Sequence, residues 1–276
     1  MTAKWVPQVS KYVLMAGVAI MMFFPIFWII STSLQTVTGV SSYPPELVPP
    51  HPQWGNYLQV LHDSSLLTYF KNTVLLIAGN TVGTLISSAM VAYPLARWEF
   101  RGKGWVFALI LATMMVPSTA TIIPQFIFFS KVGWLNTLYP LIVPAFFAYP
   151  YNVFLFRQFY RSIPKYLDEV AAIDGCTKWQ VFMKIIVPLS RPIFITIGVL
   201  SAIFWWNELL TPLIYINSNS LKPLSVGALS LFTTQYTTEY NLEMAFSVFM
   251  VVPPMVLYLV AQRYLVAGIK TTGGKN

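Results

Sequence analysis

Six long apolar runs constrain this chain more than any other feature of its sequence. They cover residues 12–33, 71–96, 105–129, 137–157, 193–216 and 244–266. A helix needs about 20 mostly apolar residues to cross the hydrocarbon core of a bilayer, and each run is long enough. Only 9% of the residues are charged, whereas a soluble domain averages about 25%. We therefore predict an all-α, polytopic membrane protein with six transmembrane helices, in which residues 1–276 form a single transmembrane domain.

The basic residues indicate how these six spans are oriented. If the N-terminus is cytoplasmic, every Lys and Arg of the 17 except Lys71, Lys131 and Lys222 falls in an inside segment. Cytoplasmic loops of membrane proteins carry such an excess of Lys and Arg, so both termini are predicted to be cytoplasmic. The net charge of +8 is then a signal of topology and gives no support to nucleic-acid binding.

Proline recurs inside the predicted spans. A membrane helix tolerates proline where neighbouring helices or water satisfy the backbone groups that it frees. The pattern is therefore typical of bent helices around a path, although static bundles also contain prolines. The positions are Pro25, Pro94, Pro117, Pro124, Pro144, Pro150, Pro212 and the pair Pro253 and Pro254.

The longest inside segment, residues 158–192, contains an unusual charged stretch, DEVAAIDGCTKW. We expect Ser162 to cap a short helix that has Pro164 in its first turn. Gly175 should end that helix in the left-handed conformation, and Thr177 should begin a second short helix. Two short amphipathic helices could lie flat on the membrane surface or dock into a groove of a cytoplasmic partner. The acidic residues Asp168 and Glu169 lie beside the apolar face of the first helix, which contains Leu167, Val170 and Ala171. They do not suit an anionic lipid surface, so they favour docking into a partner.

This stretch resembles a known motif. E-V-A-A-I-D-G, nine further residues and I-I-V-P are similar to the EAA loop of ABC-importer permeases, whose pattern is Glu-Ala-Ala, three residues, Gly, nine residues and Ile-x-Leu-Pro. Val170 and Val187 are conservative departures from it. The stretches AYPLARWEFRGK, FWWNELLTPL and QRYLVAGIK resemble the carbohydrate-uptake branch of the same family, so the resemblance covers most of the chain from Asn72 onward.

The resemblance implies a fold, a function and partners. The fold would be that of a type I ABC importer permease, in the cell membrane of a prokaryote. The chain would form the path for a sugar or oligosaccharide with a second homologous permease, a homodimer of ATP-binding subunits and an extracytoplasmic solute-binding protein. A related alternative is an importer of glycerol phosphate or another polyol. In that family the loop is a coupling helix seated in the ATPase, and the tail after Gly268 can also reach the ATPase pair. The coupling residues would be Glu169, Ala171, Ala172, Asp174, Gly175, Ile185 and Pro188.

Residue types that other functions require are missing from the sequence. It contains no G-x-x-x-x-G-K-[ST] motif, so ATP and Mg²⁺ would be bound by the partner ATPase, and this chain should bind no cofactor. His51 and His62 both fall in the first outside loop, and the single cysteine, Cys176, makes a thiolate metal site implausible. We therefore expect no catalytic residues and no metal site. The alternatives from other classes are an intramembrane enzyme with an acid-based mechanism and an ion-driven carrier; only Glu208 lies well inside a span, whereas a carrier would need several acids.

The fifth run contains the strongest candidates for a substrate path. Asn207 and Glu208 lie about 15 residues into it, roughly 22 Å deep, where polar groups are costly unless they face the bundle interior or water. The pair could therefore line the path or form interhelical hydrogen bonds. Trp205 and Trp206 could stack on sugar rings or anchor the helix at the interface. Further candidates for the path are Asn80, Gln125 and Asn152.

Overall fold

The computed structural model describes residues 5–232 and 238–273, and for residues 5–8, 230 and 263–273 it describes the backbone only. Within these residues the regular elements are helices. They belong to two compact units. The first contains the chain up to Leu67 together with Gly227–Pro253, and the second contains Thr68–Val226 together with the residues from Pro254 onward.

The first unit is built around α1 (Trp5–Ser33) and the beginning of α15 (Tyr240–Gly273). Along the sequence, α2 (Val37–Val40) and α3 (Gly55–His62) follow α1 in the same unit. The buried amide of Asn56 donates to the carbonyl oxygens of Ser33 and Gln35 at 2.9 Å, and its Oδ1 accepts from Asn241 Nδ2 at 3.3 Å. One side chain thus joins the end of α1, α3 and the start of α15.

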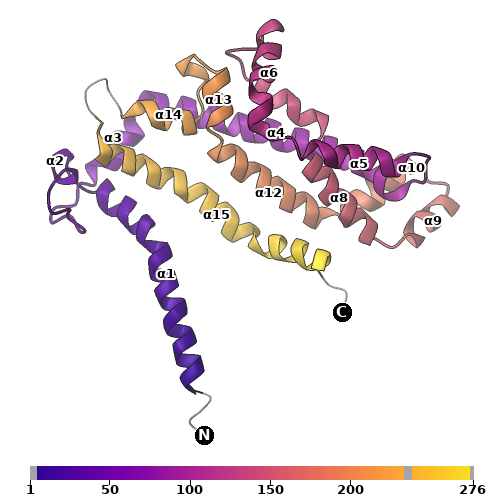
Figure 1. The fold of residues 1–276 in the computed structure, drawn as a ribbon, viewed down its shortest axis with the longest axis horizontal. Coiled ribbons are helices and arrows are strands. Elements are labelled where there is room, and N and C mark those ends of the chain that lie inside the picture. Colours follow the sequence, from indigo (N-terminus) through magenta and orange to yellow (C-terminus); the bar gives the residue numbers. More distant parts are fainter. Residues whose placement is uncertain (1–4, 233–237, 274–276) are drawn as a thin grey trace. The chain divides into compact units, whose positions relative to one another are not determined.

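The second unit is arranged around α4 (Ser64–Arg97), which runs through it (Figure 1). Helices α5 and α12 both pack against α8. Small side chains bring α4 and α12 together, because Thr81 Oγ1 donates to Ser201 Oγ at 3.2 Å and Gly198 lies against Thr81. The remaining elements are α5 (Lys103–Thr113), α6 (Ser118–Lys131), α7 (Tyr139–Ile142), η1 (Val143–Phe147), α8 (Pro150–Ser162), α9 (Tyr166–Ile173), α10 (Lys178–Val181), η2 (Phe182–Ile186), α11 (Val187–Leu189), α12 (Arg191–Asn207), α13 (Leu210–Tyr215), η3 (Asn219–Leu221) and α14 (Leu224–Leu231), the last of which reaches into the first unit.

Four helical stretches of the described residues are long and apolar enough to cross a membrane. Two further pairs pass the same test together, which makes up to six if each bent pair is one span. The run over 105–129 is one such pair, since α5 and α6 meet at a 90° bend beside Pro117. The run over 193–216 is also interrupted: α12 ends at Asn207 and α13 begins at Leu210.

The fourth apolar run is broken as well, and α4 satisfies the backbone at the break. Between η1 and α8, Ala148 has a φ of +63°, so it cannot continue a helix. Ser87 Oγ donates to the carbonyl of Ala145 at 2.8 Å and accepts the N–H of Ala148 at 3.1 Å, while Ser88 Oγ accepts the N–H of Tyr149. A non-helical turn in a membrane protein needs such substitutes for the lost helical hydrogen bonds.

Two glycines of α4 make room for α7 and η1 to pack closely against it. A Cβ built on Gly83 would come within 2.9 Å of the Phe146 ring, and one built on Gly79 within 2.7 Å of Ile142. The two glycines are one helical turn apart and share a face of α4 with Ser87.

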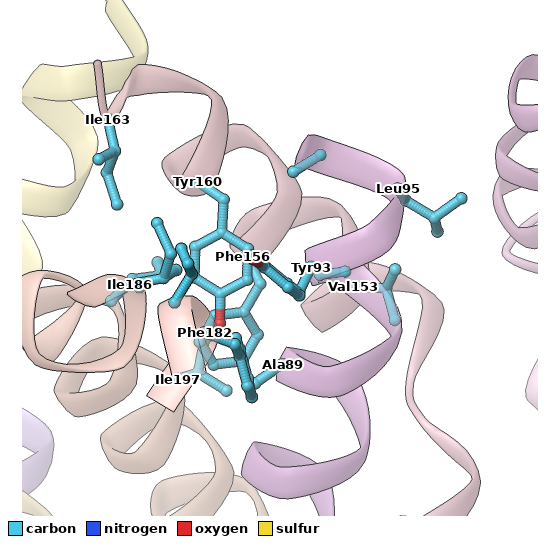
Figure 2. Close-up of a cluster of buried hydrophobic side chains, with 14 of the residues drawn as sticks. Ala89, Tyr93, Leu95, Val153, Phe156, Tyr160, Ile163, Phe182, Ile186 and Ile197 are labelled. Atoms are coloured by element: carbon cyan, nitrogen blue, oxygen red, sulfur yellow. The ribbon is translucent and has the colours of Figure 1, made fainter. Parts of the chain in front are cut away.

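A buried cluster of hydrophobic side chains lies where α4 ends. Figure 2 shows Tyr93 of α4, Phe156 and Tyr160 of α8 and Phe182 of η2 gathered in it. The rings of Tyr93 and Phe182 are 4.8 Å apart, and those of Tyr93 and Tyr160 are 6.5 Å apart. This cluster therefore packs the segment of residues 158–192 against two spans.

Candidate functional site

The segment of residues 158–192 folds into two short helices with a tight turn between them. The first, α9, carries Asp168 and Glu169 in its first turn, where negative charge interacts favourably with the helix dipole. Its start differs from the sequence prediction, which was wrong about Ser162 and Pro164. Ser162 is the last residue of α8, and its hydroxyl donates to the carbonyl of Phe159 instead of capping α9. Lys165 occupies the N-cap position.

Gly175 ends α9 as predicted. Its φ is +72°, in the left-handed region. The N–H of Gly175 donates to the carbonyl of Ala172 at 3.1 Å, and the N–H of Cys176 donates to the carbonyl of Ala171 at 2.9 Å. This pair of bonds is the Schellman motif, which satisfies the last carbonyls of the helix and turns the chain sharply.

The second helical stretch begins with a capping box at Thr177. Thr177 Oγ1 accepts the N–H of Gln180, and the side chain of Gln180 accepts the N–H of Thr177. The helix continues through a π-turn, η2, and α11 to the buried Ser190, whose N–H donates to the carbonyls of Ile186 and Val187. At this point the chain bends by 73° into α12.

Arg97, the last residue of α4, holds the first helix of the loop. Its guanidinium donates to the carbonyls of Tyr160 at 3.2 Å, Ile163 at 2.6 Å and Pro164 at 3.1 Å. Its Nε lies 2.8 Å from Asp168 Oδ2, and the Arg97 side chain is only 2% exposed. Arg97 therefore caps the end of α8 and pairs with the first turn of α9 through charge-assisted contacts.

The same end of α4 holds the second helix. Tyr93 donates its hydroxyl to the carbonyl of Lys178 at 3.1 Å. The Lys178 ammonium lies 4.7 Å from the ring centre of Trp98, within the range of a cation–π interaction. Both short helices are thus bound to residues 93–98. A movement of the loop would therefore be transmitted directly to α4.

The loop presents an apolar face to solvent, which we call the exposed loop face and define by Val170, Ile173, Trp179 and Met183. Ile173 is 86% exposed and Trp179 is 55% exposed. The residues matching the EAA motif divide into two groups around this face. Ala171 is buried and Ile185 is half-buried, so both pack the loop onto the protein. The exposed members are Glu169, Ala172, Asp174, Gly175 and Pro188.

At the break between α12 and α13, Glu208 makes its contacts locally. Its Oε1 accepts from both the N–H and the hydroxyl of Thr211 at 2.9 Å. Its backbone carbonyl accepts from Ser225 Oγ at 2.6 Å. The carboxylate therefore caps the first turn of α13, a role that neither the path reading nor the interhelical reading of the sequence included.

We predict that Glu208→Gln keeps the thermal stability of the protein, because the amide oxygen of glutamine can accept the same two hydrogen bonds. Glu208→Leu removes the cap, and a lost cap costs about 1 kcal/mol, or about 2–4 °C in Tm for a protein of this size. Thermal unfolding of the two purified variants checks this. An unchanged Tm for Glu208→Leu would contradict the capping role, and lost uptake by a stable Glu208→Gln would show that the charge itself acts on the path.

The other candidates for the path do not converge on one site in this structure. Trp205 and Trp206 are buried, and Trp206 packs edge-on against Phe70. Asn80 is fully buried and donates to the carbonyl of Leu76 in its own helix. Asn207 is exposed and also bonds within its helix, and Gln125 is exposed on α6, where it accepts from the Tyr215 hydroxyl at 3.4 Å. Asn152 lies half-buried near the start of α8.

Arg97 and Tyr93 are the functional candidates that sequence reasoning missed. Arg97 was counted only as an inside charge. Its position directly after a span, in AYPLARWEFRGK, is the signal that could have identified it, since a basic residue at a helix end can also bind the carbonyls of another helix. The part of the chain that the structure describes contains no group of three His, Cys, Asp or Glu side chains that could hold a metal ion.

Comparison with known proteins places this geometry among transport proteins. Residues 79–271 match the family described as "Binding-protein-dependent transport system inner membrane component". The arabinooligosaccharides transport system permease protein AraQ of Halalkalibacterium halodurans is 35% identical over 222 residues, which cover 80% of this chain and 79% of that protein. The melibiose/raffinose/stachyose import permease protein MelC of Bacillus subtilis is 31% identical over 265 residues, which cover 95% of each.

The fold has a solved counterpart. A chain from a bacterial ABC transporter involved in the import of the acidic polysaccharide alginate superposes with a TM-score of 0.85. The match covers 96% of this chain and 98% of that chain, at 24% sequence identity. The predicted all-α permease fold is confirmed by this match.

Proposed function

Because this chain belongs to the family of binding-protein-dependent transport system inner membrane components, we propose that it forms the transport path of a sugar importer together with a second, homologous permease. The chain is a transport subunit and not an enzyme, and ATP hydrolysis belongs to a separate ATPase. An extracytoplasmic binding protein delivers the substrate, and a pair of ATP-binding subunits drives its release. The termini and the loop of residues 158–192 face the cytoplasm, and the excess of basic residues in these segments supports this orientation.

Two observations support a sugar or oligosaccharide as the substrate. The curated relatives AraQ and MelC are named for arabinooligosaccharides and for melibiose, raffinose and stachyose. The candidate path residues also include the carboxylate of Glu208 and no basic side chain. A carboxylate would repel a phosphate group, so a sugar fits the path better than glycerol phosphate does.

The exposed loop face is the single observation that carries the ATPase-coupling role. Apolar side chains at helical spacing stand in solvent, beside the exposed acids Glu169 and Asp174. A helix that lays such a stripe into a groove of a partner buries it from water. The loop is also bound to α4 at both of its helices, so a pull on this face reaches the transmembrane part.

Glu169→Lys tests this function. Glu169 is exposed, so reversing its charge should leave the fold and membrane insertion intact while placing a cation at the contact with the ATPase. We expect the ATPase subunits to co-purify about tenfold less and uptake into proteoliposomes to fall in parallel, because like-charge contacts at an interface cost affinity. Glu46→Lys makes the same charge change at an exposed residue of the first predicted outside loop and is the matched control for ATPase co-purification. Normal ATPase retention and uptake in Glu169→Lys would mean that the loop is only a membrane-surface helix.

A further inference from the structure

A basic pocket of the second unit lies where α4 and α8 end and α5 begins. It has a volume of about 350 Å³, and its lining includes Arg97, Glu99, Lys103, Arg157, Arg161 and Lys165. Five of these side chains are cationic and one is anionic. Glu99 offsets one of the five positive charges, and the Asp168 carboxylate that pairs with Arg97 offsets another. Three positive charges therefore remain uncompensated among these groups.

Three of the cations are held in place by the fold. The guanidinium of Arg157 lies 3.8 Å from the ring centre of Phe107, and its Nε donates to the carbonyl of Leu95 at 3.0 Å. Lys103 Nζ donates to the carbonyl of Trp98 at 2.6 Å, and Arg97 is fixed by its contacts with α8 and α9. Such positioned cations lose little side-chain entropy when an anion binds. The guanidinium of Arg157 offers donors in the geometry that phosphate oxygens accept, whereas most donors of Arg97 are used by α8 and α9.

The two other cations, Arg161 and Lys165, are exposed. Lys165 Nζ is 4.0 Å from Glu99 Oε1, where both side chains are largely open to solvent, so this ion pair is weak. These two long side chains are therefore available to an incoming anion.

An apolar strip continues from the pocket along α5. Gly104 lines the pocket, and the residues that follow expose Trp105, Val106 and Leu109. Trp105 is 78% exposed and Leu109 is 65% exposed. Tryptophan beside basic residues at the end of a span is typical of the level where lipid headgroups meet acyl chains.

We propose that this pocket binds the phosphate headgroup of an anionic membrane phospholipid, with the acyl chains of the lipid along the exposed side chains of α5. A basic pocket between transmembrane helices on the cytoplasmic side suits such a headgroup. The apolar strip decides between this ligand and a free anion or an acidic segment of the ATPase, because only an amphiphile would use the cations and the strip together. The site is separate from the exposed loop face and from Glu208.

The test uses the assembled importer in mild detergent and phosphatidylglycerol brominated in its acyl chains, which quenches nearby tryptophan. The signal of Trp105 is the difference between the importer and its Trp105→Phe variant. We expect brominated phosphatidylglycerol to quench this signal, and Arg161→Gln combined with Lys165→Gln to weaken the binding about tenfold or more. Lys11→Gln combined with Arg101→Gln removes two exposed charges that do not line the pocket, both on the predicted cytoplasmic side, and should bind the lipid as the unmodified importer does.

Two further arms distinguish the sources of the anion and the alternative occupants. Brominated phosphatidylcholine has the same chains without the net charge and should quench at least tenfold more weakly; equal quenching by both lipids would overturn the headgroup site. Inorganic phosphate at millimolar concentration should not displace the lipid, and displacement would identify a free-anion site instead. Absence of quenching in the assembled importer would mean that a partner subunit covers α5, and the proposal would be wrong.

Discussion

Gly175→Val is expected to reduce sugar uptake about tenfold or more while the protein still inserts and assembles with its partner permease. A Cβ built on Gly175 meets no atom within 4 Å, so the effect does not come from a clash of this Cβ within the chain. It comes from the φ of +72°, which costs a non-glycine residue about 1–2 kcal/mol and a β-branched residue more. Valine should therefore open the turn between α9 and α10 and rotate the exposed loop face. Uptake into proteoliposomes and co-purification of the ATPase subunits measure the change.

Asparagine at the same position is the matched control. Gly175→Asn adds a side chain of similar volume, but asparagine visits the left-handed region more readily than other non-glycine residues. It should keep most of the uptake, and Gly175→Ala should fall between the two. Equal activity of the Val and Asn variants would show that the left-handed turn is unimportant for coupling.

Arg97→Gln is expected to let ATP hydrolysis continue while sugar import per ATP falls several-fold. Glutamine cannot replace the contacts to Ile163, Pro164 and Asp168 together. Breaking a buried ion pair from one side costs about 3–5 kcal/mol, because the partner group is left uncompensated. The loop would then move without carrying α4 with it. The ratio of sugar imported to ATP hydrolysed is the readout, since a general loss of stability lowers both quantities alike.

Two further variants locate the effect. Asp168→Asn removes only the ion pair and leaves the arginine its three carbonyl acceptors, so its ratio should lie between those of Arg97→Gln and the unmodified protein. Arg101→Gln removes an exposed basic residue four positions further on and should leave the ratio unchanged. An unaltered ratio in Arg97→Gln would show that α9 follows α4 without this clamp.

The apolar runs predicted the helical regions but not which of them would break. Pro25, Pro94 and Pro124 lie inside continuous helices, whereas Pro117 lies at the 90° bend, directly before α6, and Pro150 follows the turn at Ala148. The local sequence around each proline does not distinguish these outcomes. The break at Ala148 depends on a pair of serine hydroxyls about 60 residues away on α4, which only the tertiary fold brings close to it.

The loop was predictable where its signals are local. Gly175 as a left-handed cap and Thr177 as a helix start depend on contacts within a few residues, and the structure contains both. Lys165 as the N-cap in place of Ser162, and the binding of Arg97 to α8, depend on how α4 and α8 pack side by side. The distribution of charges along the sequence identifies Arg97 only as a residue of an inside segment. It does not predict how the two helices pack.

The 73° bend at Ser190 joins two helical arms into an angled lever. From Trp179 to Ser190 the arm is about 16 Å long, and α12 from Arg191 to Asn207 extends about 24 Å, at 1.5 Å per residue. A tilt of about 10° around Ser190 would displace Trp179 by about 3 Å and Asn207 by about 4 Å, given these arm lengths. The arm formed by α12 is the longer one, so a small rocking of the arm from Trp179 to Ser190 is slightly magnified at the break beside Glu208. A motor that closes by only a few ångströms has enough stroke to reshape that end of the span.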